Sequence, residues 1–356
     1  MSTHPPQKEP HLLSFTPNGF TVAVVGATGA VGRAMLDTLA RRAFPVASLR
    51  LMASKNSAGK ISSTAWGDQL VEDLDIASFE GIDVALFSAG AAVSERHAPR
   101  AAKAGVVVID NTSAFRMDPL IPLVVPEVNA AAIPAAPTII ANPNCSTIQL
   151  VLVLDVLQKL VGLESVRVAT YQSASGAGQK GINELIEGVA AYLKGEPSPI
   201  AKVHARPLAF NVVPQIGTFT ESGYTTEELK MIHEPRKILG LPQLAISATC
   251  VRVPVSRSHS EVVNVVTQAP LDVAAFRAAL EAADGLLVVD NPQRGEFPTP
   301  VDAANRFETF VGRIRKDEAH PRGLVFWVVS DNLLKGAALN AVQIAEHLWK
   351  RREDSV

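Results

Sequence analysis

The chain has 356 residues, with 33 Lys and Arg against 35 Asp and Glu, for a net charge of -2. This length allows about two domains with a large buried core. The balanced charge gives no indication of a nucleic-acid-binding or basic membrane-facing surface, and no apolar run reaches the ~18 residues that a membrane-spanning helix needs. Two cysteines, Cys145 and Cys250, do not make a disulfide framework and indicate a reducing cytoplasm. Residues 1–19 lack the features of a secretory signal and are expected to form a flexible arm.

A buried strand is predicted at residues 20–25, which are apolar and rich in β-branched residues. The turn Gly26-Ala-Thr-Gly29-Ala-Val-Gly32 follows directly, and a helical apolar spacing begins after it. A strand, a glycine-rich turn and a helix form the context of a dinucleotide-binding loop, where pyrophosphate rests on the helix N-terminus. The alternative is an ordinary tight turn, because glycines alone are weak evidence. The cofactor contacts predicted here are Gly26, Thr28, Gly29, Ala30, Val31 and Gly32.

The second strand is predicted at residues 48–53, and the loop after it bears on cofactor choice. An NAD site places an acidic residue near the end of this strand to bind the ribose 2′-hydroxyl. Residues 54–60 contain hydroxyls and two lysines but no acid. This composition suits a 2′-phosphate and favours NADP. A solvated loop that happens to lack acids is the alternative.

Strands and helices alternate up to residue 141, which predicts a parallel sheet. A strand at residues 82–87 precedes the small-residue turn Ser88-Ala-Gly90, which is expected to run close to the cofactor. A helix over 94–104, a strand over 106–110 and a strand over 138–141 follow. Arg116, in the loop 111–119, is either a solvated cation or an anion ligand.

Cys145 lies in the segment Ala141-Asn-Pro-Asn-Cys-Ser-Thr147, directly before an apolar run over 148–161 that predicts a buried helix. Ser146 and Thr147 are favourable N-cap residues. We expect Cys145 at the mouth of this helix, where unpaired amides and the helix dipole favour a thiolate. The alternative is a structural cysteine, since a free cysteine is often simply buried.

Beyond residue 166 the strict alternation ends. A strand over 166–172 leads into a glycine-rich turn over 173–181, and an amphipathic helix follows over 182–193. Thr225-Thr-Glu-Glu228 has the form of a capping box that opens another helix. Glu227 and Lys230 share one face of that helix, so a surface ion pair is the simplest interpretation.

The strand over 248–255 carries Arg252 among valines, which is unusual for a structural residue. Cys250 on the same face is expected to be packed. His259 follows at a strand junction, where it could shuttle the proton that thiol chemistry requires. Residues 298–320 are expected to form a charged connection, and a helix beginning near residue 331 could return to cover the first domain.

These features together suggest one class of chemistry. A thiolate attacks an acyl group or aldehyde, and hydride then moves between that adduct and a nicotinamide. An oxidoreductase acting on an acyl phosphate or aldehyde is the economical interpretation, with surplus cations to hold phosphate and carboxylate.

Seven motifs occur in the order seen in bacterial aspartate-β-semialdehyde dehydrogenases, so the chain resembles this family from about Phe20 to Leu348. The motifs are Gly26-Ala-Thr-Gly-Ala-Val-Gly32, Asp110-Asn-Thr-Ser-Ala-Phe-Arg116, Asn142-Pro-Asn-Cys145, Tyr171-Gln-Ser-Ala-Ser-Gly-Ala-Gly178, Glu227-Glu-Leu-Lys230, Thr249-Cys-Val-Arg-Val-Pro-Val255 and Gly312-Arg-Ile-Arg-Lys316.

The resemblance implies NADPH-dependent reduction of L-aspartyl-4-phosphate to aspartate semialdehyde and phosphate, on the route to lysine, methionine, threonine and diaminopimelate. It implies that Cys145 is the nucleophile of a thioacyl-enzyme, that His259 is the general acid/base and that Gln172 orients the reacting group. The remaining implied contacts are Arg252 with the substrate carboxylate, Glu227 with its amino group, Arg116, Asn144 and Lys230 with phosphate, Ser54 and Ser57 with the 2′-phosphate, and Ser175, Gly176 and Asn332 with the nicotinamide.

The implied fold class is α/β, with a Rossmann-type dinucleotide-binding domain and an α+β catalytic and dimerisation domain with a mixed sheet. The expected NADP-binding domain is 20–146, completed by a C-terminal helix over 332–350, and the expected second domain is 147–331, which would form a homodimer. No metal, nucleic acid or membrane is expected to take part.

The sequence departs from the family pattern in three places. Asn56 stands where family loops often carry Arg, Ser258 stands where Gly commonly precedes the active histidine, and residues 1–19 exceed the usual start. An N-acetyl-γ-glutamyl-phosphate reductase is the second enzyme hypothesis, and Glu227 argues against it because an acetylated amine needs no acidic partner. A catalytically inactive binding protein is the third, and the joint presence of Cys145, Gln172, Arg252 and His259 argues against that.

Overall fold

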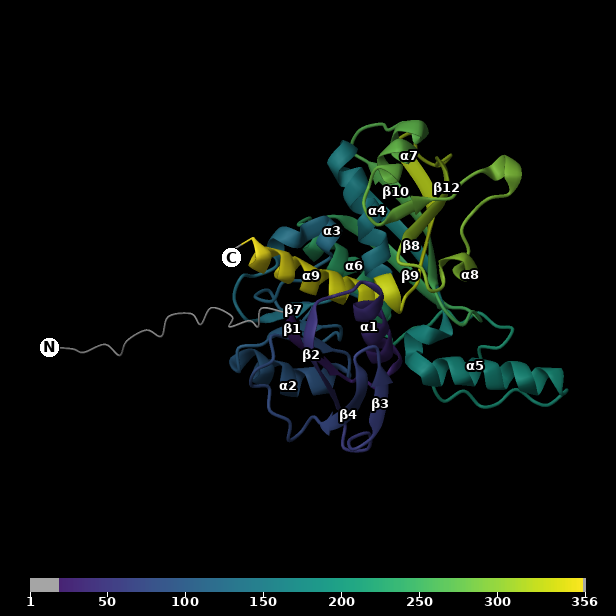
Figure 1. Cartoon of the computed structure of the whole chain (residues 1–356). Helices are drawn as coiled ribbons and strands as arrows, with labels where there is room; N and C mark the ends of the chain where they lie inside the picture. Colours follow the sequence, from purple (N-terminus) through teal and green to yellow (C-terminus); the bar gives the residue numbers. More distant parts are fainter. Residues whose placement is uncertain (1–18, 355–356) are drawn as a thin grey trace.

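The computed structural model describes residues 19–354 and contains a seven-stranded and a six-stranded sheet (Figure 1). The predicted arm at 1–19 therefore lies outside the described residues, except for Gly19. The first sheet has the order β3-β4-β2-β1-β5-β6-β7, and it is parallel apart from the β3–β4 hairpin. Its elements are β1 (Phe20–Val25), α1 (Ala30–Arg41), β2 (Val46–Ala53), β3 (Ile61–Thr64), β4 (Gly67–Asp73), β5 (Val84–Phe87), α2 (Ala91–Lys103), β6 (Val107–Asp110), α3 (Pro126–Asn129), η1 (Ala130–Ala132) and β7 (Ile139–Ala141).

The second sheet is mixed, with the order β11-β12-β13-β10-β8-β9. Its strands are β8 (Leu163–Gln172), β9 (Ala245–Arg252), β10 (His259–Thr267), β11 (Leu286–Val288), β12 (Thr309–Lys316) and β13 (Gly323–Ser330). The associated helices are α4 (Cys145–Val161), η2 (Ala174–Ala177), α5 (Gly178–Leu193), α6 (Thr226–Ile238), α7 (Val273–Glu281), η3 (Pro292–Arg294), α8 (Pro300–Ala303), the π-helical turn η4 (Leu334–Ala338) and α9 (Leu339–Glu353). The predicted fold class, a Rossmann-type domain followed by a domain with a mixed sheet, is confirmed.

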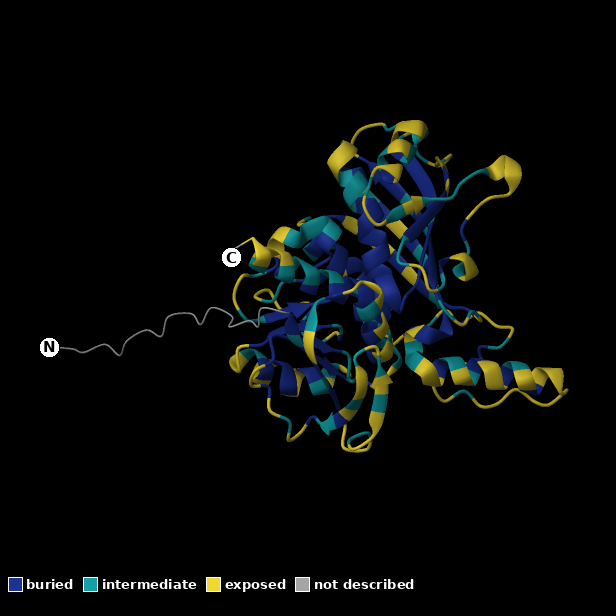
Figure 2. Cartoon of the chain, in the orientation of Figure 1, coloured by how far each residue is buried: buried dark blue, intermediate teal, exposed yellow. Residues whose placement is uncertain are grey.

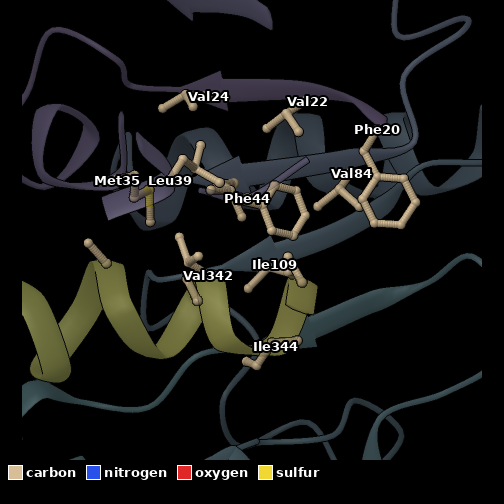
Figure 3. Close-up of a cluster of buried hydrophobic side chains, with 14 of the residues drawn as sticks. Phe20, Val22, Val24, Met35, Leu39, Phe44, Val84, Ile109, Val342 and Ile344 are labelled. Atoms are coloured by element: carbon tan, nitrogen blue, oxygen red, sulfur yellow. The ribbon is translucent and has the colours of Figure 1, made fainter. Parts of the chain in front are cut away.

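The C-terminal helix α9 returns to the first sheet, where it packs beside α1 and α3 (Figure 1). Its apolar face joins a core cluster formed by the first sheet and α1 (Figure 3). The members labelled there include Val22 and Val24 of β1, Met35 and Leu39 of α1, and Val342 and Ile344 of α9. Burial of a large aliphatic side chain contributes about 1.5–3 kcal/mol, so this contact stabilises the return of the chain.

The turn η4 connects the two sheets and is held by a buried lysine. The ammonium of Lys335 lies 2.7 and 2.8 Å from the carboxylate oxygens of Glu127 and also donates to Asn340 and Gln343. Short π-helical turns often occur at functional sites. Here the turn brings Gly336 against the N-terminus of α4.

The sequence-based description missed one hairpin and was wrong about one connection. The β3–β4 hairpin was not predicted, because residues 54–73 are mostly polar and carry no strong strand pattern. The connection expected over 298–320 contains β12, which includes the motif Gly312-Arg-Ile-Arg-Lys316. This strand alternates buried and exposed residues at its C-terminal half, so its charges face solvent while Ile314 is buried.

Helix α5 projects away from the body of the protomer, and much of its surface is exposed (Figures 1 and 2). Ile186, Tyr192 and Leu193 are exposed. No helix within the described residues is long and apolar enough to cross a membrane.

Candidate active site

Cys145 is the first residue of α4, and the strand β7 delivers the chain to it. Asn144 is the N-cap, because its side-chain oxygen accepts from the backbone N–H groups of Ser146 (3.0 Å) and Thr147 (3.4 Å). The predicted helix mouth is therefore present, but the cap is Asn144 and not Ser146 or Thr147. Both cysteines are free; Cys145 is half-buried and Cys250 is fully buried.

A cavity of about 230 Å³ lies over Cys145, between the two sheets. It is lined by most of the residues that sequence reasoning assigned to substrate and nicotinamide. These are Arg116, Asn144, Cys145, Gln172, Ser175, Gly176, Glu227, Lys230, Arg252 and Asn332. His259 lies just beneath this lining, since a Cβ built on Gly176 would come within 3.1 Å of its Nε2 and 2.5 Å of Arg252. Only a glycine fits at position 176 without displacing those two side chains.

The register of the second sheet explains how three of these side chains meet. Gln172 pairs with Arg252 on β9 and with His259 on β10, so the three stand in one row across neighbouring strands. Directly opposed residues on neighbouring strands point to the same face of a sheet. The row faces α4, whose apolar residues share a core cluster with those of β8 and β10.

The thiol and the imidazole are both neutral in the free protein. Burial, together with the nearby carboxylate of Glu227, raises the pKa of Cys145 to about 12, although the cations of Arg116, Arg252 and Lys230 oppose this. Burial and the positive charge of Arg252 lower the pKa of His259 to about 3. A base must therefore remove the thiol proton during the reaction.

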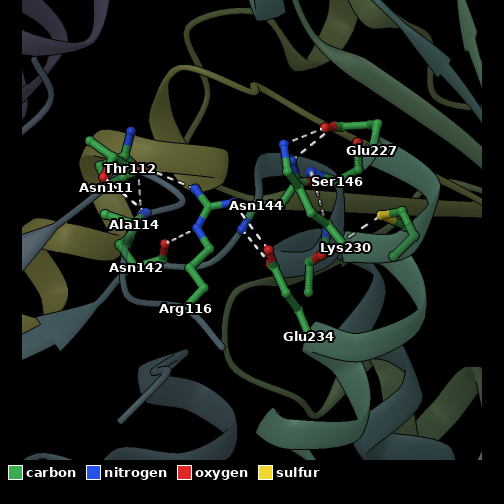
Figure 4. A network of polar contacts seen from close by, with 12 residues as sticks. Asn111, Thr112, Ala114, Arg116, Asn142, Asn144, Ser146, Glu227, Lys230 and Glu234 are labelled. Atoms are coloured by element: carbon green, nitrogen blue, oxygen red, sulfur yellow. Dashed lines mark hydrogen bonds and ion pairs between the residues drawn. The ribbon is translucent and has the colours of Figure 1, made fainter. Parts of the chain in front are cut away.

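Glu227 is at the centre of a buried polar network (Figure 4). One carboxylate oxygen accepts from the side-chain amides of Asn144 (2.9 Å) and Gln172 (3.3 Å), and the other accepts from Lys230 (2.9 Å). Burial alone would raise the pKa of Glu227, but Lys230 and the two amides lower it to about 2. The pair is thus not the surface ion pair that its spacing suggested. The predicted capping box between Thr225 and Glu228 is present.

Arg116 also lines the cavity and is buried, where it forms an ion pair with Glu234 (Figure 4). Its guanidinium donates to the carbonyls of Asn142 (2.9 Å) and Asn111 (2.8 Å) and lies 3.1 Å from the carboxylate of Glu234. Glu234 also accepts from the backbone N–H of Asn144 at 2.7 Å. Arginine has five N–H donors, so two remain for an anion in the cavity.

A second cavity, of about 540 Å³, extends along the carboxyl edge of the first sheet. Its lining includes the predicted cofactor residues Gly26, Thr28, Gly29, Ser54 and Ser88. Gly26 has φ +84°, which only glycine adopts readily, and a Cβ there would come within 3.0 Å of the backbone of Ala89. The N-terminus of α1 has no side-chain cap, so its amides are available to an anion. These features fit a bound dinucleotide.

The other predicted cofactor residues lie around this cavity or at the first one. Ala30 and Gly32 are in the first turn of α1, and Gly90 is the N-cap of α2. The hydroxyl of Ser57 is 3.4 Å from that of Thr28, so the loop after β2 reaches the glycine-rich turn. Val31 lines the cavity over Cys145, beside Ser175 and Asn332, whose side chains are hydrogen-bonded to each other at 2.9 Å.

Sequence reasoning missed several residues of the site. Glu234 follows Glu227 and Lys230 at helical spacing, so the face of α6 offered a signal that was not used. Gly336 gave no signal, yet a Cβ there would lie 2.8 Å from the Cβ of Cys145. Asp75, after β4, and the neighbouring residues Arg96 and His97 of α2 also line the cofactor cavity, and only the fold brings these two segments together.

Comparisons with known proteins agree with this geometry. Residues 21–136 match the family model "Semialdehyde dehydrogenase, NAD binding domain", and residues 154–335 match "Semialdehyde dehydrogenase, dimerisation domain". The chain is 50% identical to an aspartate-semialdehyde dehydrogenase of Aquifex aeolicus, over 93% of this chain and 98% of that protein. It is 48% identical to the enzyme of Bacillus subtilis, over 93% and 98%.

Solved structures show the same likeness. Aspartate semialdehyde dehydrogenase II of Vibrio cholerae, complexed with ASA, superposes with a TM-score of 0.91 at 47% identity, over 93% of this chain and 98% of that one. The Candida albicans enzyme with NADP gives a TM-score of 0.72 at 25% identity, over 93% and 98%. The resemblance predicted from the motifs is thus confirmed, and the chain belongs to the aspartate-semialdehyde dehydrogenase family.

Proposed function

We propose that the protein catalyses the NADPH-dependent reduction of L-aspartyl-4-phosphate to L-aspartate 4-semialdehyde and phosphate, as a step in amino-acid biosynthesis. The observation that carries this proposal is the position of Cys145. It lies at a helix N-terminus in a cavity that is also lined by the cations Arg116, Lys230 and Arg252 and by Ser175 and Asn332, which we predict to contact the nicotinamide.

The first chemical step is attack of the Cys145 sulfur on the acyl carbon of the substrate. His259 takes the thiol proton and passes it to the departing phosphate, so that a thioester and hydrogen phosphate result. Arg116 and Lys230 both line the cavity and would hold the phosphate. Asn144, also predicted as a phosphate ligand, donates one side-chain N–H to Glu227 and uses its side-chain oxygen as the helix cap, so its second N–H would serve the phosphate.

The second step converts the thioester to the aldehyde. NADPH, when bound, supplies the hydride. Gln172 stands in the row of the second sheet and donates to Glu227 of α6. It would orient the reacting carbonyl. The oxyanion that forms at this carbon receives stabilisation from the Nε2 side of His259, and its collapse releases the aldehyde and regenerates the thiolate.

Arg252 and Glu227 would select the amino-acid part of the substrate. The guanidinium of Arg252 donates one N–H to the carbonyl of Ser173 at 2.7 Å, which leaves other donors for a carboxylate. Glu227 would bind the ammonium group by exchanging it for one of its present partners. An N-acetylated substrate has no ammonium group to pair with the buried carboxylate of Glu227. Activity as an N-acetyl-γ-glutamyl-phosphate reductase is therefore disfavoured.

We propose NADP(H) as the cofactor, supported by the hydroxyls and lysines of residues 54–60. Turnover with NADPH should exceed turnover with NADH, and Ser57→Ala should reduce the preference by raising the KM for NADPH alone. Ile61→Ala in the adjoining strand β3 is the control, because the side chain of Ile61 is exposed. Equal use of both cofactors by the wild type would contradict the assignment.

We also propose a homodimer built on the second domain. The match to a dimerisation domain supports it, and so does the exposed apolar surface of α5, which the protomer leaves uncovered. Sedimentation of the wild type should give twice the mass of the chain, and a monomer at micromolar concentration would contradict this. The two free cysteines suit the reducing cytoplasm, which we propose as the location.

The decisive test of substrate is an assay of both acyl phosphates with NADPH. L-Aspartyl-4-phosphate should be reduced, and N-acetyl-γ-glutamyl phosphate should not. Reduction of the acetylated substrate alone would replace the proposal with the second candidate.

A further inference from the structure

Ser173, which follows Gln172 at the end of β8, makes two different contacts with the ring of His259. Its backbone N–H donates to Nδ1 at 3.1 Å, and its hydroxyl oxygen lies 3.1 Å from the same nitrogen. Both residues are fully buried. Nδ1 therefore faces one obligatory donor and one group that can accept.

The donor contact determines where a neutral ring carries its proton. A backbone N–H cannot accept, so the nitrogen that it contacts must be unprotonated. A neutral His259 then carries its proton on Nε2, the nitrogen that faces Gly176 and the cavity. In this form Nε2 can donate to an oxyanion, but it cannot take the proton of the Cys145 thiol.

Taking that proton requires the ring to hold a proton on Nδ1, and this proton needs an acceptor. The hydroxyl oxygen of Ser173 can accept it, because its own hydrogen has other acceptors within reach. Ser175 Oγ lies at 2.9 Å and Asn332 Oδ1 at 3.3 Å. A rotation of one buried hydroxyl thus changes which form of the ring is stabilised.

We propose that Ser173 is a positioning residue that serves both states of Nδ1 of His259, with its backbone N–H for the bare nitrogen and its hydroxyl oxygen for the protonated one. With the Nδ1 proton held by the hydroxyl oxygen, Nε2 takes the thiol proton, and the imidazolium that forms gives that proton to the departing phosphate. With Nδ1 bare, the neutral ring donates a hydrogen bond from Nε2 and transfers no proton. The two neutral forms interconvert by losing a proton to water at one ring nitrogen and gaining one from water at the other. The proposal rests on the role assigned above to His259. It also links that role to Ser175 and Asn332, the predicted nicotinamide contacts, which share the hydroxyl.

The charged groups around His259 do not supply the hydrogen bonds to Nδ1 that Ser173 supplies. Arg252 from β9 disfavours a protonated ring, Glu227 from α6 favours it, and neither is hydrogen-bonded to Nδ1 among the described residues. Cys145 from α4 and Glu261 from β10 are neutral at pH 7, because burial raises the pKa of both, to about 12 and about 8. The carbonyl of Ser258 also favours the protonated ring, so it is a competing acceptor that the test must separate from the hydroxyl of Ser173.

Ser173→Ala removes the hydroxyl and keeps the backbone N–H. Loss of an acceptor for the protonated ring should move the His259 limb of the kcat profile to lower pH by about one unit. It should also lower kcat by about tenfold, while the KM for semialdehyde and for NADP changes less than about twofold. Ser260→Ala is the matched control, because its hydroxyl is equally buried beside His259 but has no hydrogen-bond partner within residues 19–354.

Wild-type turnover, measured first, tests the proposed function separately. If the wild type turns over and Ser173→Ala has the pH profile of Ser260→Ala, the carbonyl of Ser258 suffices and the inference is overturned. A measurement on the wild type covers the case in which the variant fails to fold. Nitrogen-15 NMR of labelled histidine should find the neutral His259 ring protonated at Nε2, and protonation at Nδ1 would overturn the inference.

Discussion

Replacing Ser258 by glycine should stabilise the protein. Ser258 has φ +73°, in the left-handed region, and its hydroxyl is buried without a hydrogen-bond partner among the described residues. The left-handed conformation costs a non-glycine residue roughly 1–2 kcal/mol. A buried hydroxyl without a partner costs about 1–3 kcal/mol more. Glycine removes both costs but adds about 0.4–1 kcal/mol of unfolded-state entropy.

The expected net gain is about 1–5 kcal/mol, which corresponds to a rise of a few degrees in Tm. Ser258→Ala separates the two terms, since it removes the hydroxyl and keeps the strain. Ala43→Gly is a second control, because Ala43 is exposed and has φ 49°, so it tests strain without a buried hydroxyl. Thermal melts of the four proteins should give the highest Tm for Ser258→Gly, a lower Tm for Ser258→Ala and the lowest of these three for the wild type. The Tm of Ala43→Gly should also exceed that of the wild type.

The presentation of His259 should survive the change. The backbone N–H of Ser258 donates to Asn332 Oδ1 at 2.9 Å, and glycine keeps that bond. The serine therefore already adopts the conformation that glycine would take, and the departure from the family pattern affects stability more than catalysis. A lower Tm for Ser258→Gly, or a Tm equal to that of the wild type, would refute the reasoning.

Three further predictions concern buried positions. Gly336→Ala should reduce kcat at least about 100-fold with the fold retained by circular dichroism, because its Cβ would displace Cys145; near-normal turnover would show that α4 adjusts freely. Glu227→Gln should raise the KM for semialdehyde more than that for NADP, since it weakens the site for an ammonium group; an unchanged KM would remove Glu227 from that role. Burial raises the pKa of Glu261 from 4.5 to about 8, so the folded state keeps a proton that the unfolded chain loses. The contribution of Glu261 to stability is therefore complete below pH 4.5 and declines as pH rises through about 8. Urea titrations should therefore show that Glu261→Gln loses less stability between pH 5 and 8 than the wild type does, and parallel curves would contradict this.

The sequence was sufficient to predict the elements with strong local signals. The glycine-rich turn after β1, the apolar run of α4 and the capping box at Thr225 each depend on residues close together in the chain. The position of Cys145 at a helix N-terminus followed from the same local pattern. Hydrophobic periodicity and turn chemistry act over a few residues, so they can be identified without the fold.

The parts that depend on distant pairing were not predictable in the same way. The row of Arg252, Gln172 and His259 exists only through the strand register. The burial of Glu227, and its meeting with Lys230 at one cavity, also depend on where α6 docks, so spacing alone suggested a surface ion pair. Strand β12 was not predicted because its charged residues are typical of a solvated connection. Which of its side chains are buried depends on the neighbouring strands of the sheet.

The central claim is that Cys145 forms a thioacyl-enzyme. It is tested most directly by phosphate-dependent reduction of NADP with aspartate semialdehyde, measured for the wild type, Cys145→Ala and the control Cys250→Ala. Cys250 is fully buried, and burial raises the pKa of its thiol, so it should not act as a nucleophile. We predict that Cys145→Ala has no activity above background while Cys250→Ala remains active. Turnover retained by Cys145→Ala would contradict the account.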